Sequence, residues 1–303
     1  MISEDETSEM IPRAQSASSS SPASAWLVRW SVGDWIAVFF LIVIGFKLDQ
    51  MPPFEIDIGP QLAHDYTITY PHTPADRQQV PAPLLWKLVF FLPLVLLTPL
   101  VLFRIRSVPM IELLAQLFLG VLSSVSIALC IVCIVKNCIG RLRPDFIARC
   151  QPVDGKCTGD PLVIMEGRKS FPSGHSALSF AGLGYVSLAW LAAAMGAPML
   201  RPIGILPKLI VSGAPWTFAL LIALSRYEDY WHHWQDIVVG SLIGHLCCYG
   251  AFLFRFPAPS LGLGLMPHAI AATKAGTVGS NGMAAVSEAT GSASSTADAA
   301  KAV

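Results

Sequence analysis

The chain has 303 residues, of which 53% are hydrophobic and 13% are charged. The charged fraction is well below the ~25% that is typical of soluble domains, so an ordinary cytosolic enzyme is excluded and several membrane spans are predicted. Lys plus Arg equals Asp plus Glu at 20 each, so the net charge provides neither the basic field that nucleic acid requires nor an acidic one.

The two ends of the chain lack long apolar runs. Residues 1–26 are rich in serine and acidic side chains, and residues 257–303 consist mainly of Ala, Gly, Ser and Thr. Such compositions cannot bury enough apolar surface to offset the entropy of ordering, so both ends are predicted to be disordered tails. A membrane domain is expected between them, at residues 27–256.

The region between the tails contains six apolar segments, each long enough to cross a hydrocarbon core ~30 Å thick. The predicted fold class is therefore all-α, a polytopic membrane bundle of six transmembrane helices with disordered N- and C-terminal tails. Pro93 and Pro99 are expected to kink the second span, and the spacing of Gly240 and Gly244 suits close helix contact in the sixth. The predicted spans are residues 30–46, 84–103, 113–135, 177–195, 209–224 and 237–254.

With six spans, the polar loops at residues 47–83, 136–176 and 225–236 share one side of the membrane. Their ionisable residues cluster next to the spans instead of spreading over solvated turns. Ionisable groups in such positions indicate a functional site by default. Three segments of these loops deserve separate consideration.

The first segment runs from Lys136 to Pro144, at the end of the third span, and places Arg143 seven residues after Lys136. Both cations are then expected to point into one region. Snorkelling of Lys and Arg to the interface at a helix end produces the same pattern, and taken alone that interpretation is favoured.

The second segment is Pro172-Ser173-Gly174-His175, immediately before the fourth span. Gly174 allows backbone to approach a ligand, the start of a helix presents unpaired N–H groups to an anion, and Ser173 adds a hydroxyl. His175 can donate or accept a proton near neutral pH. The alternative is a plain turn in which a serine caps the helix.

The third segment runs from Ser225 to Asp236. On a helix, His232 and Asp236 would share one face at i, i+4, and the carboxylate would orient the imidazole. His233 is a rival at i, i+3, and geometry separates the two poorly. The alternative is an interfacial aromatic belt with flanking charges, formed by Tyr230, Trp231 and Trp234.

In this order, and on one side of one bundle, the three segments resemble the signature of the type-2 phosphatidic acid phosphatase family, the membrane lipid phosphate phosphatases. The patterns K-x6-RP, PSGH and SR-x5-H-x3-D match without departure at residues 136–144, 172–175 and 225–236. The resemblance covers residues 27–256, and the first polar loop looks like that of eukaryotic members. It implies a phosphatase site of the kind shared with vanadium haloperoxidases.

By that resemblance, His232 attacks phosphorus to form a phosphohistidine, Asp236 orients it, and His175 protonates the departing oxygen. The resemblance also favours His232 over His233. Cations replace a metal in stabilising the transition state, so neither a metal ion nor a cofactor is expected. The groups expected to bind the phosphate oxygens are Lys136, Arg143, Arg226, Ser173 and the backbone N–H of Gly174.

The expected function is hydrolysis of a lipid phosphomonoester or diphosphate, such as phosphatidate, whose partner is the substrate in the bilayer. A polyprenyl diphosphate phosphatase is the alternative enzyme, because the same cations would bind a terminal phosphate on an isoprenoid tail. A haloperoxidase is disfavoured by the six spans. From a different class, the chain could be a catalytically silent membrane scaffold or a small transporter, but the histidines and the aspartate of the signature are all present.

Cys150 and Cys157 bracket a short polar loop that would suit a disulfide in an oxidising compartment. The positive charges on the motif side argue for a cytosolic location, but Lys136, Arg143 and Arg226 are already explained by phosphate binding. The resemblance places the catalytic loops on the lumenal or extracellular face of an endomembrane or plasma membrane, with the tails in the cytosol.

The remaining polar residues receive simpler explanations. His245, inside the sixth span, is expected to make an interhelical hydrogen bond. Asp34 and Glu112 lie at span ends, where interfacial solvation is the expected explanation. A general positive field without a specific role is assigned to Arg141, Arg168 and Lys169.

Overall fold

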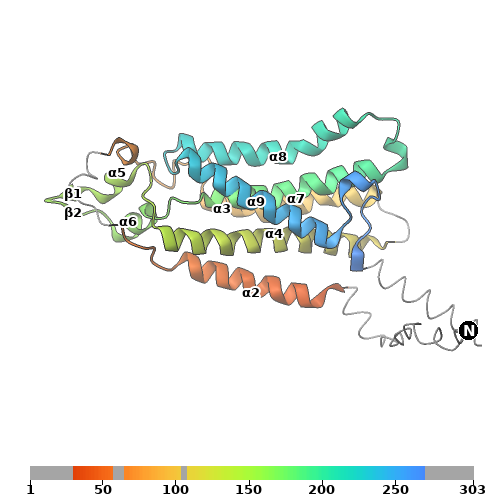
Figure 1. Ribbon diagram of the computed structural model, residues 1–303, viewed down its shortest axis with the longest axis horizontal. Helices are drawn as coiled ribbons and strands as arrows, with labels where there is room; N and C mark the ends of the chain where they lie inside the picture. Colours follow the sequence, from red (N-terminus) through yellow and green to blue (C-terminus); the bar gives the residue numbers. More distant parts are fainter. Residues whose placement is uncertain (1–29, 57–64, 104–107, 270–303) are drawn as a thin grey trace, which may run out of the picture. The chain divides into compact units, whose positions relative to one another are not determined.

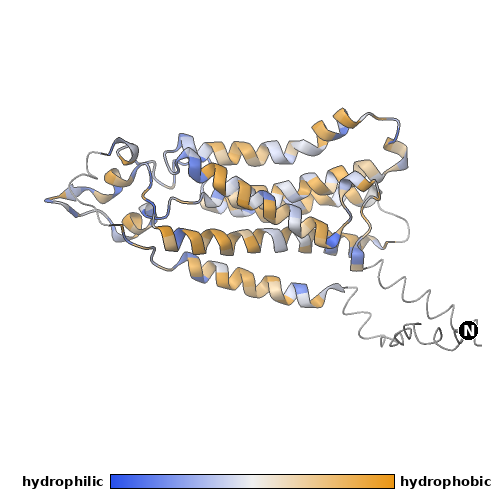
Figure 2. Ribbon diagram, in the orientation of Figure 1, coloured by the Kyte–Doolittle hydropathy of each residue, from blue (hydrophilic) through white to orange (hydrophobic). Residues whose placement is uncertain are grey.

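The computed structural model describes residues 30–56, 65–103 and 108–269, and its long elements are all helices (Figure 1). Hydrophobic residues recur along the length of these helices (Figure 2). Five of them are long and apolar enough to cross a membrane: Ala82–Leu100, which includes α3 (Ala82–Leu97), α4 (Met110–Ile139), α7 (Gly174–Gly196), α8 (Ile205–Glu228) and α9 (Trp234–Arg255).

Helix α7 is the centre of the bundle, because it packs against α3, α4, α8 and α9. It is rich in Ala, Gly and Ser, and most of its residues are buried on every side. A helix that is apolar all round is stable only when neighbours cover it, and small side chains allow those neighbours to come close. The composition of α7 therefore explains its central position.

Two glycines of α9 provide the closest approach between helices. A Cβ added to Gly240 would lie 2.4 Å from the carbonyl oxygen of Ser173, and one added to Gly244 would lie 2.3 Å from that of Ala177. Any side chain at either position would force α9 away from α7. The predicted close contact at this glycine pair is confirmed.

Helix α2 (Val32–Asp49) packs along α4 and corresponds to the first predicted span. It is 18 residues long but carries Asp34, Lys47 and Asp49, and it is not among the five helices that are apolar enough to be counted as spans. Polar contacts hold both of its ends. Asp34 Oδ2 lies 3.1 Å from Arg255 Nη2 of α9, and the carbonyl of Asp49 accepts a hydrogen bond of 2.5 Å from Lys169 Nζ.

The two acidic residues at the predicted span ends have different environments. Asp34 is exposed, and it also pairs with Arg255. Glu112 is only 7% exposed, so the expected interfacial solvation is wrong for this residue. Burial among the helices of the bundle replaces solvent around its side chain.

The second predicted span consists of two helical parts. Helix α3 continues through Pro93, and η3 (Thr98–Phe103) follows it, so the change to a 3₁₀-helix occurs next to Pro99. Short 3₁₀ elements also form η2 (Tyr66–Ile68) and η4 (Pro198–Leu200).

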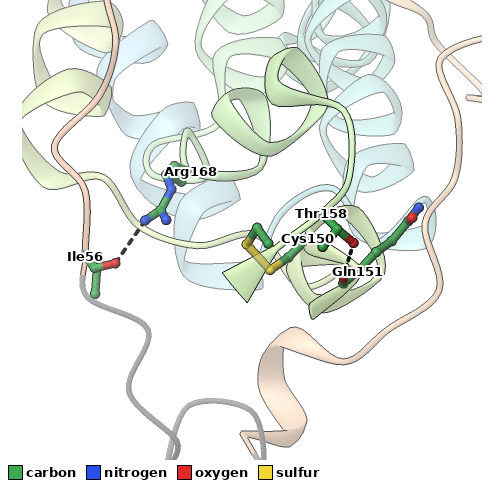
Figure 3. Close-up of a disulfide and its surroundings, with 6 residues drawn as sticks. Ile56, Cys150, Gln151, Thr158 and Arg168 are labelled. Atoms are coloured by element: carbon green, nitrogen blue, oxygen red, sulfur yellow. Dashed lines mark hydrogen bonds between the residues drawn. A yellow bond between two sulfur atoms is a disulfide. The ribbon is translucent and has the colours of Figure 1, made fainter. Parts of the chain in front are cut away.

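Between α4 and α7 lies a small region outside the long helices that the sequence did not predict in detail. It contains α5 (Phe146–Cys150), the antiparallel pair β1 (Pro152–Val153) and β2 (Lys156–Cys157), and α6 (Pro161–Gly167). A disulfide joins Cys150 to Cys157, and Thr158 Oγ1 donates to the carbonyl of Gln151 beside it (Figure 3). Arg168 Nη1 donates to the carbonyl of Ile56, which ties this region to the segment that follows α2 (Figure 3).

The chain after α9 packs back on the bundle. The 3₁₀-helix η5 (Pro259–Leu261) contacts α7, and Leu265 is 2% exposed within the main hydrophobic core. A Cβ on Gly196 would lie 2.3 Å from the Cα of Gly264, so the two backbones touch. The predicted disordered tail is therefore wrong for residues 257–269, whereas residues 1–26 and 270–303 lie outside the described residues.

Replacing Gly244 with Ala should destabilise the bundle by about 1–3 kcal/mol, because the added methyl group overlaps the backbone of α7. Gly250 of α9 is the matched control, since a Cβ there meets nothing within 4 Å and Ala has the higher helix propensity. The thermal midpoint in detergent should fall for Gly244→Ala and stay level or rise for Gly250→Ala. Equal midpoints would show that α7 and α9 separate without cost.

Candidate active site

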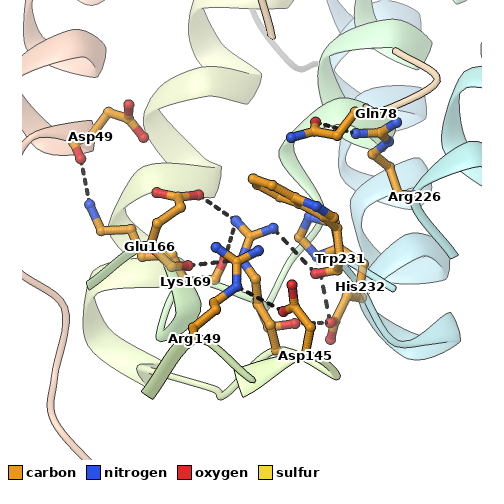
Figure 4. Close-up of polar contacts among 12 residues, drawn as sticks. Asp49, Gln78, Asp145, Arg149, Glu166, Lys169, Arg226, Trp231 and His232 are labelled. Atoms are coloured by element: carbon orange, nitrogen blue, oxygen red, sulfur yellow. Dashed lines mark hydrogen bonds and ion pairs between the residues drawn. The ribbon is translucent and has the colours of Figure 1, made fainter. Parts of the chain in front are cut away.

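The three predicted segments meet at one end of the bundle. Lys136 lies in the last turn of α4, Ser173 begins α7, and the third segment forms the end of α8 and the start of α9. These helices alternate in direction, so two C-termini and two N-termini come together at the same end. Figure 4 shows the polar side chains that gather there.

Gly174 and Lys136 are close neighbours. A Cβ on Gly174 would lie 3.7 Å from Lys136 Nζ, so the missing side chain lets the ammonium lie beside the first turn of α7. Ser173 is the N-cap of α7, and its Oγ accepts hydrogen bonds from the backbone N–H and the hydroxyl of Ser176. The capping interpretation is therefore correct for Ser173, and the start of α7 lies close to the Lys136 ammonium.

Arg143 is 1% exposed, and four of its five N–H groups are already bonded. Nε donates to the carbonyl of Glu166 at 2.8 Å, and Nη1 donates to the carbonyl of Trp231 at 3.2 Å. Nη2 donates to the Glu166 carboxylate and to the carbonyl of Lys169 (Figure 4). The guanidinium is thus held rigidly, with one Nη1–H left for a ligand.

Arg226 is fully buried and held in the same way. Nη2 donates to Asp229 Oδ2 at 2.6 Å and to Ser225 Oγ, Nε also donates to Ser225 Oγ, and Nη1 donates to Gln78 Oε1 at 2.9 Å. One Nη1–H again remains. Both arginines are therefore preorganised, which reduces the entropy that an anion must overcome to bind.

Three arginines at this end are paired with carboxylates, of which the sequence singled out Asp236 but not Glu166 or Asp229. In the described part of the chain, no carboxylate lies within ion-pair distance of the ammonium groups of Lys136 and Lys169, so both contribute unbalanced charge; Lys169 Nζ donates to the carbonyl of Asp49. The pairs are Arg143 with Glu166, Arg226 with Asp229, and Arg141 with Asp236.

Burial by itself would raise the pKa of Glu166, but the Arg143 guanidinium and the ammonium groups of Lys136 and Lys169 outweigh it and hold the pKa below its ordinary value. Glu166 therefore stays ionised beside these cationic groups. A buried arginine without this partner would be strongly destabilising.

His232 does not lie on a helix with Asp236. Helix α8 ends at Glu228 and α9 begins at Trp234, so His232 lies in the turn between them, and the predicted i, i+4 helical relation is wrong. The turn nevertheless brings the two side chains together, with His232 Nδ1 3.6 Å from Asp236 Oδ2. This separation is beyond hydrogen-bond distance, and none of the described residues bonds to this buried nitrogen.

Asp236 is fully buried and has four closer contacts. Its Oδ1 accepts from Arg141 Nη1 at 2.7 Å, and its Oδ2 accepts from Ser170 Oγ at 2.5 Å and from the backbone N–H of His233 at 3.0 Å. His233 Nδ1 lies 3.3 Å from the same Oδ2. Arg141 and Ser170 therefore hold this carboxylate, although the sequence assigned Arg141 no role and did not single out Ser170.

The two adjacent histidines differ in what remains free. Both ring nitrogens of His233 face oxygens, because Nε2 lies 3.2 Å from the carbonyl of Thr67. His232 is 2% exposed, and within the described residues neither of its ring nitrogens is hydrogen-bonded. Only the His232 ring thus keeps a nitrogen available for reaction.

The segment of residues 65–81 is part of the polar loop at residues 47–83 and directly precedes α3. It is called the first loop below, and it covers this end of the bundle. The carbonyl of Val80 lies 3.0 Å from His175 Nε2, Gln78 bonds Arg226, and the carbonyl of Thr73 accepts from Trp231 Nε1 at 2.9 Å. The sequence patterns did not predict these contacts, because the first loop lies outside the three segments. It nevertheless contacts the second and third of them directly.

Within residues 30–56, 65–103 and 108–269, no three side chains of His, Cys, Asp or Glu are grouped so that they could hold a metal ion. The groups that could hold an anion are Lys136, the free N–H groups of Arg143 and Arg226, and the start of α7.

Burial lowers the pKa of His232 from 6.5 to about 3, and the Asp236 carboxylate offsets only part of that effect. His232 is therefore neutral throughout the physiological range. Because the unfolded chain binds this proton near the ordinary pKa and the folded chain does not, stability from this group is complete above pH 6.5 and is lost as the pH falls toward 3.

Between about pH 7.5 and pH 5, wild-type protein should lose about 2 kcal/mol more stability than His232→Gln, which cannot take up the proton. Thermal unfolding of both proteins in detergent over this range measures the difference. Other groups contribute equally to both proteins and cancel. Parallel stability curves would mean that His232 titrates alike in the folded and unfolded states.

Comparisons with known proteins agree with this geometry. The model of the PAP2 superfamily matches residues 117–259. Lipid phosphate phosphatase 2 of Arabidopsis thaliana is 35% identical over 254 residues, which cover 80% of this chain and 83% of the relative. Diacylglycerol pyrophosphate phosphatase 1 of Saccharomyces cerevisiae is 31% identical, with 76% and 81% covered. No solved structure matches the chain.

A further relative is the probable diacylglycerol pyrophosphate phosphatase 1 of Schizosaccharomyces pombe, which is 35% identical over 75% of this chain and 82% of its own length. These relatives and the five apolar helices indicate a multi-pass membrane protein. Because such relatives match over most of their length, the chain belongs to the PAP2 superfamily.

Proposed function

We propose that this phosphatase hydrolyses phosphatidate or a related lipid phosphate without a metal ion, through a phosphohistidine intermediate. The observation that carries the proposal is the phosphate clamp, defined as Lys136, Arg143 and Arg226, beside a neutral buried histidine at the end of an apolar bundle. The names of the relatives support a lipid phosphate as substrate. A phosphate bound at the clamp can belong to a lipid whose hydrocarbon tail stays in the bilayer.

The clamp would stabilise charge on the phosphate during transfer. Lys136 brings a positive charge that no carboxylate of the described residues pairs with, and Arg143 and Arg226 each offer one remaining N–H in a fixed position. The N–H groups at the start of α7 add to them, as does the field of the helix terminus. Preorganised donors in a buried site stabilise a transition state without reorganising, which is the main requirement of phosphoryl transfer.

The histidines divide the chemistry between them. A ring nitrogen of neutral His232 attacks phosphorus, a P–N bond forms, and the bond from phosphorus to the lipid oxygen breaks. Asp236 stabilises the positive charge that develops on the ring. His175 acts in its doubly protonated form, in which Nε2–H donates to the carbonyl of Val80 and Nδ1 gives its proton to the departing oxygen. Water then attacks phosphorus, returns a proton to His175 and releases His232 with inorganic phosphate.

His232→Ala should abolish release of phosphate from phosphatidate, whereas His233→Ala should leave most of it, because both ring nitrogens of His233 are already engaged. His175→Ala removes the general acid and should lower the rate of phosphate release by about 10²- to 10⁴-fold. Radiolabelled substrate should leave acid-labile label on His175→Ala and none on His232→Ala. Equal labelling of both variants would contradict this division of roles.

The same assay, run on a panel of lipid and polyprenyl phosphates, should proceed in excess EDTA and be inhibited by vanadate. Turnover that EDTA abolished and Mg²⁺ restored would show that the metal-free mechanism is wrong. Faster release from polyprenyl phosphates than from every glycerolipid would assign the enzyme to isoprenoid substrates.

Trp231 is positioned to act on the nucleophile next to it. The guanidinium carbons of Arg143 and Arg149 each lie 4.4 Å from its ring centroid, and its carbonyl accepts from Arg143. Arg149 is in turn paired with the fully buried Asp145 (Figure 4), and His72 of the first loop bonds the same carboxylate. Trp231 therefore connects a clamp cation to the backbone of His232.

Trp231→Leu should lower kcat by up to ~100-fold, because small misplacements of reacting groups have effects of that size. Trp234→Leu is the matched control, since Trp234 is 61% exposed and should tolerate the change. Trp231→Phe keeps a ring under the guanidinium groups and should restore part of the rate. If vanadate inhibited folded Trp231→Leu as strongly as wild type, Trp231 would have no role in positioning the clamp.

The proposal extends to topology. Helix α2 would be the sixth span, because its ends contact Arg255 and Lys169 at opposite ends of the bundle. The tails would then lie in the cytosol, and the clamp and the disulfide-bearing region would lie in the lumen or outside the cell. A disulfide between Cys150 and Cys157 persists only in an oxidising compartment, which supports this orientation.

Mass spectrometry of protein from native membranes, with free thiols blocked at lysis, should recover Cys150 and Cys157 as one disulfide-linked peptide pair. Cys138, which is exposed and has no disulfide partner, should be alkylated in the same sample and serves as the internal control. Full alkylation of all three would place the active site in the cytosol.

A further inference from the structure

A cavity of about 170 Å³ lies between α7, α8 and α9, away from the residues that bind phosphate. Its lining is mostly apolar, and small side chains create much of the space. The lining residues that are small or carry a polar group include Gly184, Ser187, Ser212, Gly213, Trp216 and His245. None of these residues belongs to the three signature segments.

The cavity lies at a definite depth below the clamp. Gly184 follows Gly174 by ten residues on α7, and Trp216 precedes Arg226 by ten on α8. On α9, His245 follows Asp236 by nine residues. At about 1.5 Å per residue, each interval is about 14–15 Å along a helix. The walls of the cavity are thus the same three helices whose ends carry His175, Arg226 and Asp236.

Aromatic rings close one side of the cavity. Trp216 Nε1 lies 3.4 Å from both ring nitrogens of His245, and the Trp216 ring packs edge-on against Phe180 of α7. The interhelical contact expected for His245 is thus made with Trp216. His245 is nevertheless exposed halfway along α9, and an imidazole at membrane depth is costly unless it faces a cavity or a functional site.

We infer that this cavity binds one hydrocarbon chain of the lipid whose phosphate occupies the clamp, an inference that rests on the proposed function. Such a chain must continue from the phosphate into the bilayer, roughly parallel to the helices. An apolar cavity of about 150 Å³ is known to accept a ring the size of benzene, so a segment of chain fits.

The cavity would distinguish lipids by chain length. Lipid tails are as apolar as the cavity, so leaving the bilayer gives a chain no hydrophobic gain. The selection comes from dispersion contacts with the walls, which only a chain long enough to reach them can make. Substrates with short chains would use the clamp alone.

Gly213→Leu tests this inference because it fills the cavity with little risk to folding. A Cβ on Gly213 meets nothing within 4 Å, and Leu has the higher helix propensity. Gly250→Leu adds the same side chain at an equally open glycine of α9 that does not line the cavity. Dioleoyl and dihexanoyl phosphatidate, assayed in the same detergent, are the long and short substrates.

Gly213→Leu should lower kcat/KM for dioleoyl phosphatidate at least ~10-fold, because binding energy from a part of the substrate far from the reacting atoms is lost. The kcat/KM for dihexanoyl phosphatidate and the inhibition by vanadate should stay unchanged. Gly250→Leu should change neither substrate. Equal effects of Gly213→Leu on both substrates, or no effect on either, would overturn the inference.

A binding measurement separates this inference from the proposed function. A phosphatidate that carries a diazirine at the end of one chain should crosslink to residues lining the cavity, and Gly213→Leu should remove those crosslinks. Failure of wild-type protein to hydrolyse any lipid phosphate would defeat the proposed function, while the crosslinks would still test the cavity. Crosslinks spread evenly over the outer surface would show that annular lipid alone is present.

Discussion

Burial of several cations at the end of an apolar bundle is the constraint on which the catalytic end depends. A guanidinium removed from water must find acceptors, and Arg143 and Arg226 each make four hydrogen bonds. The carboxylates of Glu166 and Asp229 offset their charge, so that an anion meets rigid donors instead of mobile side chains. Positive charge without a paired carboxylate remains at the Lys136 and Lys169 ammonium groups, and an anion can offset it.

This arrangement requires that helix ends come close together, and small residues make that approach possible. The contacts of Gly240 and Gly244 with the backbone of α7 bring the start of α9 beside the start of α7. As a result, the backbone N–H of Ser173 donates to the carbonyl of Asp236, which links the second signature segment directly to the third. Packing in the membrane and geometry at the site are therefore one property of these two helices.

The first loop adds a functional element that is not part of the signature. Gln78 and the carbonyl of Val80 engage Arg226 and His175 from the same short stretch, directly before α3. Both are neutral acceptors, so they hold Arg226 and His175 in place without adding negative charge to this end of the bundle. His72 and Thr73 connect the same loop to Asp145 and Trp231, next to His232.

The sequence by itself determined the membrane character, the three segments and the residue types of the site, because composition and short-range spacing are properties of the covalent chain. The turn at His232, the partners Glu166 and Gln78, and the packing of Leu265 were decided only by the tertiary structure. Each depends on contacts between residues far apart in the chain or on a local break in a helix. Gln78 and Arg226, for example, are 148 residues apart, and only the folding of α3, α7 and α8 into one bundle makes them neighbours.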